Sequence, residues 1–151
     1  MPAIVEERPN SPDASALIDE LEVHLASLYP SESRHGYTVE KLLREGVAFF
    51  VVREDGVPAG CGGVQLYGTE FGELKRMYVR PRFRGRGLGK LVLEHLTGYA
   101  QERGVGLLRL ETGIYQNEAI CLYEASDFRR VPPFGEYKED PLSLFFEKPI
   151  A

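Results

Sequence analysis

The sequence predicts an α+β fold (mixed α/β) in which helices flank a mostly antiparallel sheet. Three β-rich segments follow one another between residues 47 and 79, and Asp55-Gly56 is a strong hairpin signal between the first two. A strand, a long helical repeat and a further strand then come in order, which indicates a parallel crossover. We therefore expect about six to seven strands with a central parallel pair, and about four helices, in a single domain over residues 1–151.

The first part of the chain is expected to form a strand and two helices. Residues 3–8 are the strand. Ser11-Pro12-Asp13 begins a helix, because it supplies a capping hydroxyl, a proline at the first helical position and an acid in the first turn. Leucines at helical spacing extend this helix to about Tyr29: Leu17, Leu21, Leu25 and Leu28. After a break, a short second helix is expected over Val39–Arg44.

The remaining elements follow from alternation, turn residues and helical spacing. Strands are expected at Val47–Val52, Val57–Tyr67, Glu73–Val79, Leu107–Thr112, Phe128–Val131 and Leu142–Glu147. Helices are expected from near Gly87 to Arg103-Gly104 and over Asn117–Ala125.

The composition limits the cellular location and the binding partners that we expect. With 43% hydrophobic and 27% charged residues the chain is of the globular class, and no run reaches the length of a membrane-spanning helix. The first residues lack the order of a signal peptide, so we expect a cytoplasmic protein with no membrane partner. A net charge of −5 disfavours nucleic acid as a partner.

The two cysteines, Cys61 and Cys121, fit no metal-ligand spacing and fall in different expected elements. In a reducing compartment both are expected to be small buried hydrophobes and not a disulfide. No metal site is expected.

The junction after residue 79 combines glycines with positive charge. Gly85, Gly87 and Gly89 allow sharp turns and close approach of a ligand, and the helix behind them presents unpaired N–H groups and the positive end of its dipole. Basic side chains add positive charge at the same place: Arg80, Arg82, Arg84, Arg86 and Lys90. This combination is typical of a phosphate or pyrophosphate site.

Two familiar nucleotide-binding loops do not fit this segment. Counted from Gly85, the sixth position of a dinucleotide fingerprint holds Lys90 in place of glycine. A P-loop requires Ser or Thr where Leu91 stands, and glycine where Arg84 stands. A solvated glycine-rich turn stays open as an alternative, as does a nucleic-acid patch around Phe83, although the acidic chain disfavours the latter.

Two motifs together resemble the GNAT superfamily of N-acetyltransferases, over residues 47–128. The first is Arg84-x-x-Gly87-x-Gly89, which follows a strand, opens a helix and is similar to the family's acetyl-CoA motif. The second is Asn117-Glu118-Ala119-Ile120-Cys121-Leu122-Tyr123-Glu124 with Asp127-Phe128 after it, where Asp127 replaces the family's usual glycine. The resemblance implies a small bacterial-type, acyl-CoA-dependent N-acetyltransferase with acetyl-CoA as co-substrate.

The resemblance also implies a cofactor site, made of a strand end, the loop and one residue of the later helix: Met77, Tyr78, Val79, Arg84, Gly85, Arg86, Gly87, Leu88, Gly89, Lys90 and Asn117. The Met77 N–H is the expected donor to the thioester carbonyl. Asn117 has a second interpretation as a helix N-cap.

Tyr123 and Glu73 are the expected catalytic residues. By the resemblance Tyr123 is the acid that protonates the departing thiolate, a group of similar basicity; the alternative is a packed core tyrosine. Glu73 is the expected base, acting directly or through a water, and the alternative is a solvated residue at a strand end. Other candidate bases are Glu111, His24, His35 and His95.

The expected reaction is direct attack by a primary amine of a small molecule on acetyl-CoA. In the family, acceptor choice comes from segments that correspond to residues 29–37 and 132–141. Their side chains suit a carboxylate, an aromatic ring or a cation: Arg34, His35, Tyr37, Phe134, Tyr137 and Lys138. A protein or peptide N-acetyltransferase and a non-catalytic acyl-CoA-binding module are the alternatives. A homodimer is a further expectation carried from the family.

Overall fold

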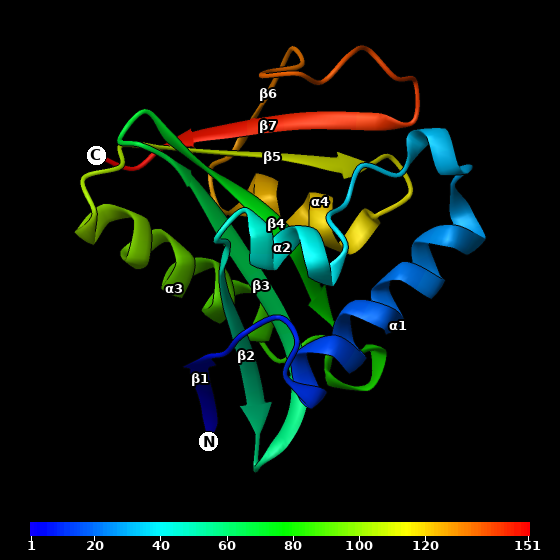
Figure 1. Cartoon of the computed structure of the whole chain (residues 1–151), viewed down its shortest axis with the longest axis vertical. Helices are drawn as coiled ribbons and strands as arrows, with labels where there is room; N and C mark the ends of the chain where they lie inside the picture. The colour runs from blue at the N-terminus through cyan, green and yellow to red at the C-terminus, as the bar shows by residue number, and fades with distance from the viewer.

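The computed structural model describes residues 1–151 and contains one seven-stranded sheet with four α-helices packed around it (Figure 1). The strands are β1 (Pro2–Glu6), β2 (Ala48–Glu54), β3 (Val57–Tyr67), β4 (Phe71–Val79), β5 (Leu107–Gly113), β6 (Arg129–Val131) and β7 (Ser143–Pro149). The helices are α1 (Pro12–Leu28), α2 (Val39–Arg44), α3 (Leu88–Glu102) and α4 (Asn117–Ala125), with two short 3₁₀ turns, η1 (Ser31–Ser33) and η2 (Pro81–Phe83).

The strand order is β1-β2-β3-β4-β5-β7-β6, and only β4 and β5 run parallel. All other neighbours are antiparallel. The predicted fold class, with its central parallel pair, is therefore confirmed. The α3 crossover connects these two strands, as the strand–helix–strand series indicated.

Local signals explain the helix starts. The Ser11 hydroxyl accepts a hydrogen bond from the Ala14 N–H at 3.1 Å and caps α1, with Pro12 as the first helical residue. Thr38 caps α2 in the same way, through the Lys41 N–H at 3.1 Å. The apolar stripe predicted for α1 is wrong at its end, because Leu28 is 38% exposed.

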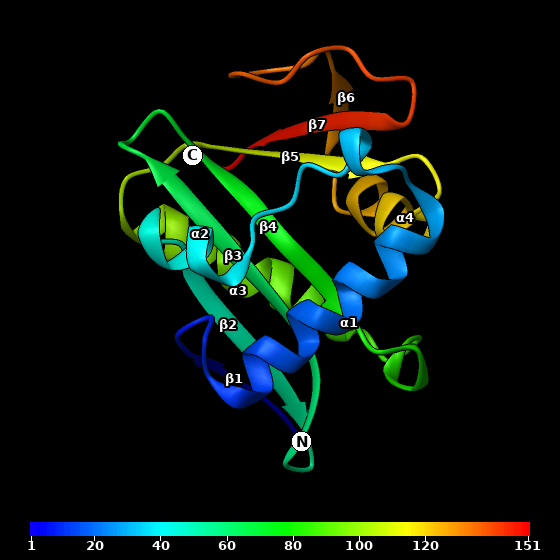
Figure 2. The same ribbon diagram turned by 45° about the vertical axis from the view of Figure 1, so that its right-hand side comes forward.

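Helices cover both faces of the sheet (Figure 2), and a separate hydrophobic cluster lies on each face. On one face α3 and α4 bury residues such as Leu96 and Tyr123 against β2–β5 and β7. On the other face α1 and α2 bury residues such as Leu17 and Leu42 against Phe49 and Val51. The prediction of two buried cysteines holds for Cys61 and is wrong for Cys121, which is exposed. Cys121 lies two residues before the buried Tyr123, and this spacing puts it on the opposite side of α4.

A bulge in β4 separates it from β5 and opens the sheet. Arg76 has a φ of +55°, which is rare for a residue with a side chain, and the β3–β4 register shifts there, between Cys61 and Gly63. The parallel pairing of β4 with β5 covers only Gly72 with Leu108 and Glu73 with Arg109. Beyond this point the strands diverge, and α4 lies beside the opening (Figure 1).

None of the helices combines the length and the apolarity needed to cross a membrane.

Candidate functional site

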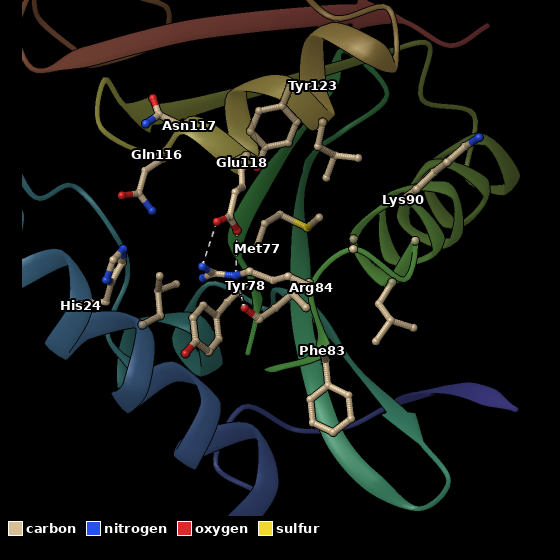
Figure 3. A pocket seen from close by; sticks show the side chains of 18 of the residues that line it. His24, Met77, Tyr78, Phe83, Arg84, Lys90, Gln116, Asn117, Glu118 and Tyr123 are labelled. Carbon is tan, nitrogen blue, oxygen red and sulfur yellow. Dashed lines mark hydrogen bonds and ion pairs between the residues drawn. The ribbon is translucent and has the colours of Figure 1, made fainter. Parts of the chain in front are cut away.

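A groove of about 500 Å³ lies where β4 leaves β5 (Figure 3). One wall is the end of β4 with the loop and first turn of α3, and the other is α4 with Leu21 and His24 of α1. Of the predicted site residues, these line it: Met77, Tyr78, Val79, Arg84, Gly85, Gly87, Leu88, Gly89, Lys90, Asn117 and Tyr123. Arg86 and Glu73 do not line it. The structure thus brings together the strand end, the glycine-rich loop and the α4 motif.

Backbone N–H groups dominate the loop end of the groove. The six consecutive N–H groups from Gly85 to Lys90 donate to no acceptor of the protein, and the first bond of α3 runs from the Leu91 N–H to the Gly87 carbonyl at 3.0 Å. Gly85 and Gly87 have φ values of +78° and +77°, the left-handed conformation that glycine adopts without strain. Free donors at the positive end of a 15-residue helix form an anion site.

Three of the five basic side chains at this junction, Arg80, Arg84 and Lys90, form ion pairs. Arg80 pairs with Glu20 at 2.6 Å and Lys90 with Glu94 at 3.9 Å. The Lys90 side chain also points away from the centre of the groove (Figure 3). Arg82 and Arg86 lie over the Phe83 ring, at 4.7 and 5.4 Å from its centroid. Basic side chains thus lie at this junction as predicted, several of them in ion pairs, and backbone N–H groups supply unpaired donors at this end of the groove.

Arg84 crosses the groove to α4. Its Nε lies 2.8 Å from Glu118 Oε2 and also donates to the Val79 carbonyl at 3.0 Å (Figure 3). The Glu118 side chain is 66% exposed and lies in the first turn of α4. This ion pair connects the two walls of the groove near the unpaired N–H groups.

Tyr123 lies in the wall that faces Met77. It is 4% exposed, and burial together with the negative charge of Glu111 raises its pKa above the ordinary value for a phenol. No hydrogen bond to another protein group affects its hydroxyl. The alternative of a packed core tyrosine is confirmed, because the ring packs beside Phe128 and Phe146. Tyr123 also lines the groove, and its role as the acid stays a prediction.

Asn117 is the first residue of α4, and the N-cap position belongs to Gln116. The alternative interpretation of Asn117 as the N-cap is thus wrong. Neither its neighbour Gln116 nor any other side chain caps this helix with a hydrogen bond. Asn117 contributes to the wall of the groove at its α4 end.

A second pocket of about 100 Å³ adjoins the groove. The two share five wall residues: Leu21, Met77, Gln116, Ala119 and Tyr123. The rest of its wall comes from the end of α1, residues 33–36, β4 and β5. Glu111 of β5 lines it and accepts a hydrogen bond from the Ser143 hydroxyl at 2.9 Å. Burial raises the pKa of Glu111 above the ordinary value for a carboxyl, although the Ser143 bond and the charge of His35 act in the opposite direction.

Glu73 is held away from both pockets. Its carboxylate Oε2 lies 2.7 Å from Lys75 Nζ and accepts a hydrogen bond from the Tyr137 hydroxyl at 2.6 Å. The side chain is 4% exposed, so the alternative of a solvated strand-end residue is wrong. The assignment of Glu73 as the base stays a prediction, since Glu73 lines neither pocket.

The three histidines differ in position. His24 lines the groove, and His35 lines the second pocket with Nε2 3.5 Å from Asp140 Oδ2. His95 is exposed on α3 and packs edge-on against Phe50, with centroids 4.8 Å apart. Sequence reasoning missed Leu21 and Arg76 as wall residues, because an amphipathic helix and a strand residue carry no signal that they face a pocket.

Comparison with known proteins points to one family. The model of the acetyltransferase (GNAT) family matches residues 15–128. An IAA acetyltransferase of Azospirillum brasilense is 42% identical, with 97% of each chain covered. The uncharacterized N-acetyltransferase YsnE of Bacillus subtilis (strain 168) is 34% identical, over 89% of this chain and 91% of that one. A crystal structure of a Klebsiella pneumoniae protein assigned as an acyl-CoA N-acyltransferase superimposes with a TM-score of 0.85 at 35% identity, covering 100% of this chain and 99% of the other.

Proposed function

This chain belongs to the GNAT family of acetyltransferases, and we propose that it transfers an acetyl group from acetyl-CoA to the primary amine of a small molecule. The acetyl carbonyl carbon gains a bond to the amine nitrogen and loses its bond to sulfur. The amine loses a proton and the thiolate gains one, so the products are the N-acetyl amine and free CoA.

One observation carries the proposal: the unpaired N–H groups from Gly85 to Lys90. Six donors at a helix N-terminus suit the pyrophosphate of CoA. The end of β4, from Met77 to Val79, has no β5 partner and lines the same groove. This edge can bind the pantetheine amides as a strand would. The volume of about 500 Å³ suits an extended ligand of this kind.

Tyr123 is the proposed acid. Its hydroxyl has no protein partner, and it lies in the wall common to the groove and the second pocket, where the departing sulfur and the acceptor amine would meet. With its pKa above the ordinary value for a phenol, Tyr123 stays protonated throughout the physiological range and so holds the proton that the departing thiolate needs.

Two carboxylates compete for the role of base. Glu73 is the candidate from the resemblance, but taking a proton there would break its ion pair with Lys75. Glu111 lines the second pocket together with Tyr123, and burial raises its pKa, which makes it a stronger base than an ordinary carboxylate. We therefore favour Glu111. Glu111→Gln should lower kcat about 100-fold, whereas Glu73→Gln should affect thermal unfolding more than kcat. The reverse result would make Glu73 the favoured base again.

The acceptor is proposed to be small. The second pocket has about 100 Å³, well below the volume that a drug-sized ligand fills. The similarity to a protein named IAA acetyltransferase supports a small-molecule acceptor. The test is release of free thiol from acetyl-CoA with panels of small amines and of peptides. Turnover of peptides alone would refute this choice, and no thiol release despite acetyl-CoA binding would indicate a non-catalytic module.

A further inference from the structure

We infer that the acceptor is an amino acid, an amine that also carries a carboxylate, and that Arg34 and Arg76 bind this carboxylate. This inference rests on the proposed function. The inference comes from the second pocket, where two guanidiniums and Glu111 line one small space. Neither arginine belongs to the loop and helix motifs that identify the cofactor groove.

The two arginines converge on a single acid from different parts of the chain. Arg34 Nη1 lies 3.2 Å from Glu22 Oε1, and Arg76 Nη2 lies 2.8 Å from Glu22 Oε2. Two cations therefore share one carboxylate, which leaves an excess of positive charge in this wall. His35 lies in the same wall, and its one acidic partner is Asp140.

Several donors of these arginines have no protein partner. Arg76 uses Nε for the Tyr37 carbonyl at 2.8 Å and Nη2 for Glu22, which leaves Nη1 free. Arg34 uses only Nη1, and its Nε is buried without a hydrogen-bond partner. A guanidinium that is incompletely satisfied in a partly buried pocket favours a planar anion with two acceptor oxygens, which is the geometry of a carboxylate.

The geometry of Arg76 is specified by the fold. Its positive φ belongs to the bulge that separates β4 from β5, so the same distortion that opens the groove also aims this side chain. A Cβ at Gly36 would lie 2.5 Å from Arg76 Cζ, so the loop backbone packs closely on the guanidinium. Such support keeps a binding group in place without the ligand.

The opposite charge in the pocket completes the match. Glu111 lines the same space and can accept the proton of an ammonium group, while Tyr123 and Met77 lead to the cofactor groove. An α-amino acid places its ammonium and carboxylate on one carbon, and it fits a pocket of about 100 Å³ with an acid in one wall and two arginines in another. A simple amine would leave the free donors of the two guanidiniums without an acceptor.

The test uses two matched sets of acceptors with the intact protein and acetyl-CoA: alanine, alaninamide and ethylamine, and phenylalanine, phenylalaninamide and phenethylamine. The amino acids should have a kcat/KM about 10- to 100-fold above that of their amides, because a charge-assisted pair is lost in the amide. Arg34→Gln should raise KM for the amino acids by the same factor, with kcat changed by less than about threefold and the amides unaffected.

Arg44→Gln is the matched control, because Arg44 is an exposed residue at the end of α2 that pairs only with the adjacent Glu45. Arg44→Gln should leave the KM for the amino acids and the KM for the amides unchanged. Arg34→Lys keeps the charge but not the planar fork, and should recover part of the affinity for the amino acids. Equal use of the amino acid, the amide and the amine, or an equal rise of all KM values in Arg34→Gln, would overturn the inference.

Calorimetric titration of alanine, phenylalanine and their amides into the protein saturated with CoA separates this inference from the proposed reaction. Selective binding of the amino acids without acetylation would uphold carboxylate recognition and refute the reaction. Acetylation of amino acids and amides alike would uphold the reaction and refute carboxylate recognition. Absence of both binding and acetylation would refute the two together.

Discussion

The proposed cofactor groove and the proposed acceptor pocket adjoin at Met77 and Tyr123, yet they are built from different parts of the polypeptide. The groove depends on backbone: six consecutive free N–H groups and two glycines in the left-handed conformation. The pocket depends on side chains from α1, the loop before α2, β4 and β5. A backbone site is sensitive to conformation and tolerant of side chains, whereas a side-chain site changes with single substitutions. Family membership therefore informs on the cofactor far better than on the acceptor.

The most damaging expected change is Gly87→Val, which tests whether the groove depends on backbone conformation. At a φ of +77° a β-branched residue is strained, so the loop must leave the geometry that aligns its N–H groups, although the Cβ itself would meet no neighbour. Acetyl-CoA affinity should fall by at least about 100-fold, because several charge-assisted hydrogen bonds are lost together. Calorimetric titration with acetyl-CoA measures this.

Gly98→Ala is the control for Gly87→Val. Gly98 lies inside α3, has an ordinary φ, and a Cβ there would meet nothing within 4 Å. This change should leave acetyl-CoA affinity intact and stabilise the protein slightly, because alanine is the better helix former. Unaltered affinity in Gly87→Val would show that side chains and not the backbone hold the cofactor.

Tyr123→Phe tests the point where the two regions meet. It removes one hydroxyl and keeps the ring that packs beside Phe128 and Phe146. We expect kcat to fall about 100-fold as the thiolate loses its proton donor, while the affinity for acetyl-CoA and the melting temperature stay close to those of the parent. Single-turnover kinetics and calorimetry separate the two effects. An unchanged kcat would leave Tyr123 as a core residue only.

The same contrast explains what could be predicted from the sequence. The limits of α2, β3 and α4 agree with the sequence expectation, because caps, turn residues and apolar spacing are local. The glycine loop was recognisable for the same reason, since its donors are consecutive in the chain. The ion pairs of Arg80 and Arg84 could not be predicted, because their partners Glu20 and Glu118 lie far away in sequence.

The acceptor pocket could not be read in this way. Arg76 pairs with Glu22, which lies 54 positions away in the chain, and no local pattern encodes such a pair. The bulge at Arg76 was also beyond prediction, because it arises from the register between two strands and not from the residue itself. Sequence motifs therefore predicted the kind of ligand that the groove binds, and the arrangement of the elements moved the proposed base from Glu73 to Glu111.

Glu111→Gln has a second expected effect, on stability. Since the pKa of Glu111 is raised by folding, the native state holds the proton more tightly than the unfolded chain, and stability falls as pH rises from about 4.5 through the native pKa. The glutamine variant lacks this fall. Its melting temperature should exceed that of the parent at pH 7 and equal it near pH 4, as differential scanning fluorimetry would measure. If the parent and the variant had the same melting temperature as each other at pH 7 as well as at pH 4, folding would leave the Glu111 pKa unshifted.

The smallest expected effect concerns the ion pair that crosses the groove. Arg84 and Glu118 are both partly solvated, so their mutual attraction contributes little to stability. The Glu118 carboxylate nevertheless occupies the guanidinium beside the anion site and repels phosphate. Glu118→Gln should therefore tighten acetyl-CoA binding about two- to fivefold, and the gain should shrink as salt screens the charges. Glu102→Gln, at the far end of α3, is the matched control and should change nothing. If Glu118→Gln weakens binding instead, the pair positions Arg84 for the cofactor, and the groove depends on a side-chain arrangement as well as on its backbone.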